Sequence, residues 1–345
     1  MAEILALGLS HYPMLANPDD RMSWLHKMML KNPELDESLR DPRNWPPEMQ
    51  AEWGDDEGAS GAARHRAEIL AWLRRVRAAI DDFRPDFILI WGDDQYENFR
   101  EDVIPPYCVN IYDKYRITVP ANNVWGETAE DEYDLPGHVP AGKFLVSRLI
   151  AEGFDAAYAY KPLHHPLGHA FSNAIHYLNY DRTGFHYPIL PVTLNCYGTR
   201  VICQRGGLPD FTRKMGPDDF DPPAPTPRRL FDLGAATARI LADSPYRVAL
   251  LASSSWSHAF LNANEKFFKP DIEADLRLYE ALRAGRYDVW RDYPASEIEP
   301  RGQQEVLNWM CLAGALQALG RVPETTGFVK TWIFNSSKVF LISRP

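Results

Sequence analysis

Short apolar runs alternate along this chain with longer segments in which apolar residues recur at helical spacing. The run at 4–9 stops at His11, and the run at 86–91 stops at a polar stretch that includes Gln95. Between them, residues 62–83 carry an apolar stripe with the period of a helix. A short apolar run that ends in polar residues is typical of a buried strand. The pattern therefore predicts a strand, a helix and a second strand, the repeating unit of an α/β fold.

The same alternation continues to the end of the chain. Strands are expected at 105–112, 154–160, 187–195, 246–252 and 338–343, and helices at 141–153, from about 169 to 178, and at 227–242, 271–290 and 302–320. Helices that alternate with apolar strands predict a mainly parallel central sheet flanked by helices. We expect a single catalytic α/β domain over residues 1–345.

Three segments depart from this alternation. Residues 14–60 are rich in Met, Trp, Asp, Glu and Pro and have only weak helical periodicity. We interpret them as a helical insertion that forms a lid within the domain, with apolar side chains such as Trp24 and Trp53 available to cover a site. Residues 113–138 and 204–227 are polar and contain Pro and Gly, so they are expected to be long loops.

Composition narrows the class of protein. The chain has 345 residues and a net charge of −10, without a basic cluster, so a nucleic-acid partner is not expected. The N-terminus lacks the basic region of a signal peptide, and no apolar run approaches the roughly 18–20 residues that span a bilayer. The four cysteines show neither metal nor disulfide spacing. This favours reduced thiols in a cytoplasmic protein without a membrane partner.

Polar residues that could do chemistry follow three different apolar runs. They are His11, Gln95 and His258. In α/β folds the carboxyl ends of parallel strands border one crevice, so residues far apart in sequence can share a site there. A single histidine at a strand end is most often structural, but three such strand ends in one chain favour a functional site.

Two further candidates lie at the starts of expected helices. Glu305 precedes the apolar residues Val306 and Leu307. It is either a first-turn glutamate favoured by the helix dipole or a buried carboxylate that needs a cation or hydrogen-bond donors. His169 follows Gly168 just before a helix, where its side chain can face a pocket.

The remaining signals carry less weight. His164 and His165 are expected in a loop or behind the site, and His65, which lies between two arginines on a helix, is expected at the surface. Phosphate-binding loops, nucleophile elbows, zinc-protease motifs and paired cysteine motifs are absent from the sequence.

A set of short motifs, taken in order, identifies a family that the chain resembles. The motifs are Ser10-His11-x-Pro13, Pro85-Asp86 with Asp94-Gln95-x-x-x-Phe99, Ile104-Pro105, Gly168-His169-Ala170, Ser257-His258, Glu305 with Trp309, and Phe334-Asn335-Ser336. Together they resemble the class III extradiol ring-cleaving dioxygenases, of the protocatechuate 4,5-dioxygenase catalytic-subunit type. The resemblance covers nearly the whole chain apart from 14–60 and parts of the long loops. Each motif is short, so their order and spacing carry the resemblance.

The resemblance implies an extradiol class III fold and a non-heme Fe(II) ion. The three positions that hold iron in that family fall on His11, Gln95 and Glu305. Gln95 stands where the family has a histidine, and an amide oxygen is a weaker ligand than imidazole. Asp93 or Asp94 is the alternative third ligand, which would make the site more anionic.

Two further histidines flank the substrate in that family. By this resemblance His169 would contact substrate and oxygen, and His258 would be the acid/base residue. We also expect Asp94, His165 and Tyr12 to bind substrate.

The function expected from these features is ring cleavage of a catechol-like or related phenolic substrate with O2, by an enzyme that forms a homo-oligomer. Fold alone does not determine function, so two alternatives stay open. One is a non-oxidative enzyme on the same scaffold, in which His258 and His169 support hydrolysis, decarboxylation or carbon–carbon cleavage. The other is a non-catalytic subunit that pairs with an active relative.

Overall fold

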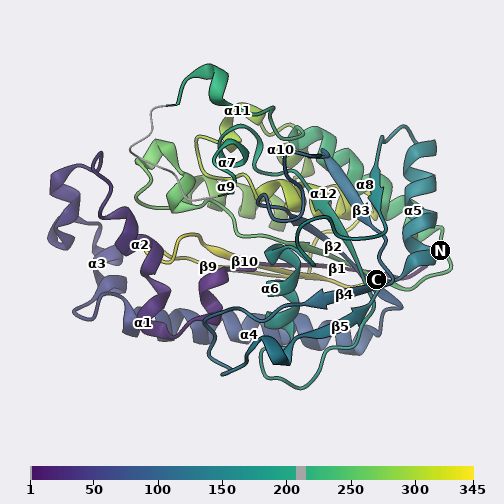
Figure 1. The fold of residues 1–345 in the computed structure, drawn as a ribbon, viewed down its shortest axis with the longest axis horizontal. Helices are drawn as coiled ribbons and strands as arrows, with labels where there is room; N and C mark the ends of the chain where they lie inside the picture. The colour runs from purple at the N-terminus through teal and green to yellow at the C-terminus, as the bar shows by residue number, and fades with distance from the viewer. Residues whose placement is uncertain (1, 207–214) are drawn as a thin grey trace.

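A mixed sheet runs through the middle of the molecule (Figure 1). The computed structural model describes residues 2–206 and 215–345. In the described part of the chain the strands of this sheet lie in the order β6-β3-β7-β2-β8-β1-β10-β9. Their bounds are β1 (Ile4–Leu9), β2 (Phe87–Asp93), β3 (Tyr107–Asn110), β6 (Ala157–Ala159), β7 (Ile189–Leu194), β8 (Val248–Ser253), β9 (Thr325–Val329) and β10 (Lys338–Ser343).

The middle of the sheet is parallel. β7, β2, β8 and β1 are neighbours in that order, each parallel to the next, and every residue of these four strands is buried. Antiparallel neighbours flank them, with β3 beside β7 and β10 beside β1. The expected α/β class is therefore confirmed, with a parallel centre and antiparallel pairs on either side. The carboxyl ends of the parallel strands meet at one edge, where such folds bind ligands.

Each strand contributes to two cores, because successive side chains point to opposite faces of a sheet. On β1, Leu5 and Leu7 belong to one core, whereas Ile4 and Ala6 belong to the other. The unbroken apolar runs in the sequence are explained by this burial on both faces.

Helices cover both faces of the sheet (Figure 1). α4 (Ala59–Phe83) and α6 (His169–Leu178) pack on one face, and α8 (Pro227–Ala242) and α12 (Val306–Ala318) pack on the other. The backbones of α8 and α12 approach so closely that a Cβ at Gly234 would lie 1.9 Å from the carbonyl oxygen of Cys311, so only glycine fits there. The other α-helices beyond α4 are α5 (Val139–Ala151), α7 (Gly198–Cys203), α9 (Ile272–Arg283), α10 (Tyr287–Arg291) and α11 (Ala295–Ile298). Among the described residues, no helix is both long and apolar enough to cross a membrane.

The segment 14–60 consists mainly of short helices. They are η1 (Pro13–Ala16), α1 (Asp19–Met22), α2 (Trp24–Met29), η2 (Glu37–Arg40), η3 (Pro42–Asn44) and α3 (Pro47–Trp53). α1 and α3 pack on α4, and α2 packs on η6 (Ala259–Leu261), the turn that follows His258. The segment therefore lies beside a candidate site residue, and its role as a lid stays a prediction.

Three local expectations from the sequence are wrong. The helix expected at 271–290 is divided into α9 and α10, with residues 284–286 between them and a positive φ of 67° at Gly285. Residues 113–138 include an antiparallel hairpin of β4 (Lys114–Ile117) and β5 (Tyr133–Pro136). Each strand has only four residues, too few for periodicity to reveal. His65 is buried rather than at the surface, and its ring centroid lies 5.1 Å from that of Phe334. The arginines beside it in sequence were a poor guide, because adjacent helical residues point in different directions.

Candidate metal centre

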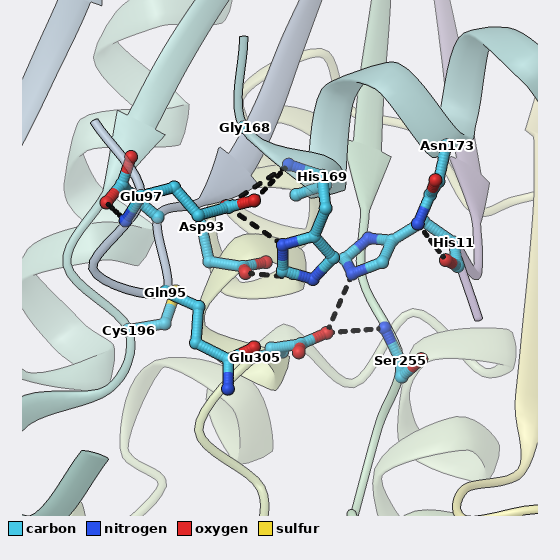
Figure 2. Close-up of polar contacts among 12 residues, drawn as sticks. His11, Asp93, Gln95, Glu97, Gly168, His169, Asn173, Cys196, Ser255 and Glu305 are labelled. Atoms are coloured by element: carbon cyan, nitrogen blue, oxygen red, sulfur yellow. Dashed lines mark hydrogen bonds and ion pairs between the residues drawn. The ribbon is translucent and has the colours of Figure 1, made fainter. Parts of the chain in front are cut away.

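Four side chains from four different elements converge at the carboxyl edge of the parallel strands (Figure 2). His11 follows β1, Asp93 ends β2, His169 begins α6 and Glu305 immediately precedes α12. One potential ligand atom from each lies within 4.8 Å of those from the others. These four residues are called the ligand cluster below.

The hydrogen bonds of His11 determine which of its ring nitrogens is free. Its Nδ1 lies 3.1 Å from Oγ of Ser253, and that hydroxyl donates its own hydrogen to the Ala170 carbonyl oxygen at 2.6 Å. The serine oxygen can therefore only accept from Nδ1–H, which leaves the lone pair on Nε2. His11 Nε2 is buried and has no hydrogen-bond partner among the described residues. Burial lowers the pKa of His11 to about 4, so its imidazole is neutral at pH 7.

Glu305 presents both carboxylate oxygens to donors. Oε1 accepts from the Tyr197 hydroxyl and lies 3.1 Å from His258 Nε2, while Oε2 accepts from the Ser255 amide at 2.8 Å. Oε2 also lies 3.3 Å from Nε2 of His11. Burial opposes ionisation, but the imidazoles of His258 and His11 outweigh it and hold the pKa of Glu305 well below its usual range.

Asp93 has one oxygen held and one oxygen free. Asn308 Nδ2 donates to its Oδ1 at 3.0 Å, whereas Oδ2 is buried without a hydrogen-bond partner among the described residues. Burial, together with the nearby carboxylate of Glu305, raises the pKa of Asp93 well above its usual range. Two buried carboxyl groups so close together need a cation or a proton between them.

Glu97 orients the fourth member of the cluster. Its Oε2 lies 2.9 Å from His169 Nδ1, and its Oε1 accepts from the His169 backbone N–H at 2.9 Å. This leaves Nε2 of His169 facing Asp93 Oδ2, at 4.0 Å. Burial alone would lower the pKa of His169, but Glu97 outweighs it, and the pKa rises to about 10. A carboxylate that holds the far nitrogen of a histidine is the usual outer partner of a metal ligand.

The donor set of the cluster fits a divalent metal ion. His11 Nε2 and Asp93 Oδ2 are buried atoms without a hydrogen-bond partner among the described residues, and both lie near the anionic Glu305. Lone pairs that face one another repel unless a cation lies between them. Two imidazoles and two carboxylates are a donor combination that first-row divalent metals accept.

Gln95 has a different set of contacts from the one expected of a ligand. Its amide Nε2 donates to the Gly206 carbonyl oxygen at 2.8 Å, which ties it to the turn that follows α7. β2 ends at Asp93, and Tyr96 has a positive φ of 60°, so the chain turns sharply beside Gln95. Asp93, the alternative third ligand considered from the sequence, is the residue of this turn that joins the cluster. A ligand role for Gln95 stays a prediction.

Two of the three residues expected to contact substrate are engaged within the protein. Asp94 accepts backbone N–H bonds from residues 97, 98 and 99, so it caps the turn after β2. Tyr12 is buried, and its hydroxyl donates to the carbonyl oxygen of Met22 at 2.8 Å. His165 instead lines a recess of about 340 Å³ that also reaches His169 and Glu97. Substrate contact by all three stays a prediction.

His258 lies next to the cluster, and its role as an acid/base residue stays a prediction. Since the Glu305 carboxylate only accepts, His258 Nε2 carries the hydrogen of their 3.1 Å contact. Its Nδ1 is buried and has no partner among the described residues. Asp275 supports this geometry, because it accepts from the Ser257 hydroxyl at 2.6 Å and from Gln303 Nε2 at 2.8 Å. It thereby joins the loops that carry His258 and Glu305.

Sequence reasoning missed several residues that organise the cluster. Tyr197 follows β7 and could have been found by the strand-end rule that selected His11. Asn308 and Ser253 carry no local signal, because polar residues in apolar elements are recognised only once their partners are known. Glu97 lies in the polar turn after β2 and has no signal of its own in the sequence.

The fold and the ligand cluster define an α/β protein with a buried group of side chains that could hold a metal ion. No protein-family model matches the chain. Its curated relatives are dioxygenases of aromatic acids by name, and they support the extradiol dioxygenase superfamily and enzyme class that the sequence motifs predicted.

Three of these relatives carry the same enzyme name. The chain is 25% identical over 250 residues to 2,3-dihydroxyphenylpropionate/2,3-dihydroxicinnamic acid 1,2-dioxygenase 2 of Pseudomonas putida, a match that covers 70% of this chain and 62% of that protein. It is 28% identical over 272 residues to the dioxygenase from Photorhabdus laumondii subsp. laumondii, covering 73% and 72%. With the dioxygenase from Paraburkholderia xenovorans it shares 24% over 310 residues, covering 79% and 91%. The first match spans less than two thirds of its relative.

Proposed function

We propose that this protein is a metal-dependent extradiol-type dioxygenase that cleaves the ring of a catechol-like substrate. One observation carries the proposal: the lone pairs of His11 Nε2 and Asp93 Oδ2 are buried beside the Glu305 carboxylate with no donor assigned to them. Similarity to dioxygenases named for 2,3-dihydroxyphenylpropionate supports the same reaction class. Fe(II), a class III extradiol fold and a homo-oligomeric state are part of the proposal. The protocatechuate 4,5-dioxygenase subtype stays a prediction.

His11, Asp93 and Glu305 would hold the ion, with His169 as a fourth ligand. Binding the ion would displace the protons that His169 and Asp93 hold in its absence. The charges then balance, because two neutral imidazoles and two carboxylates neutralise a divalent cation. Bound Fe(II) supplies coordination of the two adjacent diol oxygens and the redox chemistry of O2. In this arrangement Asp93 takes the place that the Gln95 position has in the family that the chain resembles.

His258 would move the substrate proton. Its Nε2–H is directed to Glu305 Oε1 at 3.1 Å, so Nδ1 is the atom that can accept a proton from a diol hydroxyl. General acid–base catalysis by a positioned histidine typically contributes about 10²–10⁴-fold to the rate. The Asp275 contacts with Ser257 and Gln303 hold the loops that carry His258 and Glu305 at a fixed distance from each other.

The recess beside His169 would receive the rest of the substrate. It is lined by residues from four segments that are far apart in the sequence: Pro13, Met14, Asn17, Glu97, Thr118, Val119, Pro120, Ala121, Asn122, His165, His169, Ser172 and Asn173. Met14 and Asn17 belong to the insertion at 14–60, so this segment would shape the pocket. A cover made by the insertion would also exclude water during the reaction.

Metal analysis combined with oxygen uptake tests the proposal. Protein expressed in iron-supplemented medium should contain Fe(II), consume O2 with a panel of catechols and form a ring-opened product with a new visible absorbance. Removing the metal with a chelator should stop both signals, and adding Fe(II) should restore them. Protein that contains no metal after expression in iron-supplemented medium, and that consumes no O2 with any catechol after Fe(II) is added, would contradict the proposal. Anaerobic turnover of a phenolic substrate would instead favour the non-oxidative alternative.

A further inference from the structure

Tyr197 contacts the ligand cluster through Glu305, and the roles proposed for the histidines do not account for this contact. It follows β7, the fourth parallel strand that ends at this edge of the sheet. Its side chain is buried, and its hydroxyl donates to Oε1 of Glu305. The direction of this bond is determined, because an ionised carboxylate can only accept.

The Tyr197 hydroxyl helps to give the two carboxylate oxygens of Glu305 different sets of partners. Oε1 accepts a hydrogen bond from the Tyr197 hydroxyl and contacts Nε2 of His258. Oε2 accepts from the Ser255 amide and is the oxygen in contact with Nε2 of His11. The tyrosine therefore helps to hold Oε1 away from the cluster and Oε2 toward it. A carboxylate with both oxygens held cannot rotate freely about its last bond.

The Tyr197 hydroxyl also matters because Oε1 of Glu305 has only one other side-chain donor among the described residues, His258. His258 Nε2 lies 3.1 Å from Oε1, so a variant that lacks this imidazole leaves Oε1 to the tyrosine alone. A buried acceptor left without a donor costs about 1–3 kcal/mol. With the Tyr197 hydroxyl in place, Oε1 keeps a donor in that variant.

We infer that Tyr197 is a positioning residue for the metal ligand Glu305: its hydroxyl orients the carboxylate so that Oε2 faces the ion. The inference rests on the proposed metal site. Outer partners of metal ligands typically contribute about 10–100-fold to metal affinity, and the Tyr197→Phe variant should lose affinity in that range.

The test measures Fe(II) binding without substrate, so that it does not depend on turnover. Metal-free wild type and Tyr197→Phe are titrated anaerobically with Fe(II) against a competing chelator, and the visible spectrum of each Co(II)-loaded protein is recorded. The matched control is Tyr115→Phe, because Tyr115 is also buried but donates to the Asn110 carbonyl oxygen outside the cluster. We expect weaker binding and a shifted Co(II) spectrum for Tyr197→Phe only.

The outcomes separate this inference from the proposed function. If wild type binds neither metal, the proposed function fails and the inference with it. If wild type binds and Tyr197→Phe has the same affinity and the same Co(II) spectrum, only the inference is overturned. If Tyr197→Phe does not fold, 3-fluorotyrosine at position 197 keeps the hydroxyl as a stronger donor. It should shift the Co(II) spectrum, and an unchanged spectrum would overturn the inference.

Discussion

Asn308 Nδ2 donates to Oδ1 of Asp93 at 3.0 Å, and Oδ2 is the oxygen left without a hydrogen-bond partner among the described residues, 4.0 Å from Nε2 of His169. Asn308 also donates to the carbonyl oxygen of Ser253 at 3.2 Å, the residue whose hydroxyl holds Nδ1 of His11. One amide on α12 thus links two of the proposed ligands. Because Asn308 holds Oδ1 and leaves Oδ2 free to bind, Asp93 is better placed to bind a cation than its neighbours Asp94 and Gln95.

Replacing Asp93 should weaken metal binding more than replacing Gln95. Asp93→Asn removes the anionic oxygen from the cluster, so Fe(II) affinity should fall by more than the roughly 10–100-fold typical of losing an outer partner. Gln95→Ala removes only the bond to Gly206 and should bind Fe(II) nearly as wild type does. Chelator competition on the metal-free proteins measures both. The opposite ranking would identify Gln95 as the ligand, as the family pattern implies.

His258→Ala should lose activity but keep the metal. The side chain is outside the ligand cluster but donates to Oε1 of Glu305. Fe(II) affinity should therefore fall by no more than the roughly 10–100-fold typical of losing an outer partner, and excess Fe(II) should still load the variant. The loss of His258 as acid/base residue should lower kcat/KM by about 10²–10⁴-fold. His164→Ala is the control, because that imidazole pairs with Asp102 on the exposed surface. An unchanged kcat/KM in His258→Ala would remove this residue from the mechanism.

The recess should favour a catechol with an uncharged substituent. Among the described residues that line it, none is Lys or Arg, and Glu97 is acidic. Arg21 contacts Asn122 at 3.4 Å but does not line the recess. The methyl ester of 2,3-dihydroxyphenylpropionate should therefore have a higher kcat/KM than the free acid, since the recess offers a carboxylate no Lys or Arg and its His169 is already paired with Glu97.

A charge introduced at the rim of the same recess should change this preference. Asn122 is exposed, so Asn122→Arg should fold and raise kcat/KM for the acid relative to the ester. Asn122→Gln, which adds length without charge, should leave the ratio unchanged. A wild-type preference for the acid, with no response to Asn122→Arg, would place the substituent elsewhere.

Asp275 should make stability depend on pH. Burial raises its pKa to about 7 from an ordinary value of 3.8, although bonds from Ser257 and Gln303 oppose this. Between these values the folded protein binds a proton that the unfolded chain does not, so this group's contribution to stability falls as pH rises from about 4 to 7 and is level above. Asp275→Asn lacks this titration.

Thermal unfolding between pH 4 and 8 measures the effect. The difference in Tm between wild type and Asp275→Asn should change across that window in favour of the variant as pH rises. The absolute Tm of the variant is not the test, because asparagine also changes the bonds to Ser257 and Gln303. Asp288→Asn on the exposed side of α10 is the control. A constant Tm difference at all pH values would contradict the assignment.

Local pattern was enough to predict much of the fold and three site residues. The strands that became β1, β2 and β8 are unbroken apolar runs, and their composition alone indicates burial on both faces. His11 and His258 could then be placed at one edge, because parallel strands end on the same side of a sheet. Glu305 was recognisable because a charged residue precedes a mainly apolar helix.

Only the tertiary structure decided which neighbours complete the site. Asp93, Asp94 and Gln95 are consecutive polar residues, and their roles depend on where β2 ends and how the chain turns at Tyr96. Sequence does not contain that geometry, because the turn is held by distant partners such as Gly206.

The same reason applies to Asn308 and Tyr197. Each is an ordinary residue in its own segment and acquires a role only through a partner more than a hundred positions away. Periodicity reports which face of an element is buried, so the sequence by itself determined the elements and their burial. Hydrogen bonds between elements depend on the packed arrangement, and that arrangement alone decided which atoms face the proposed metal.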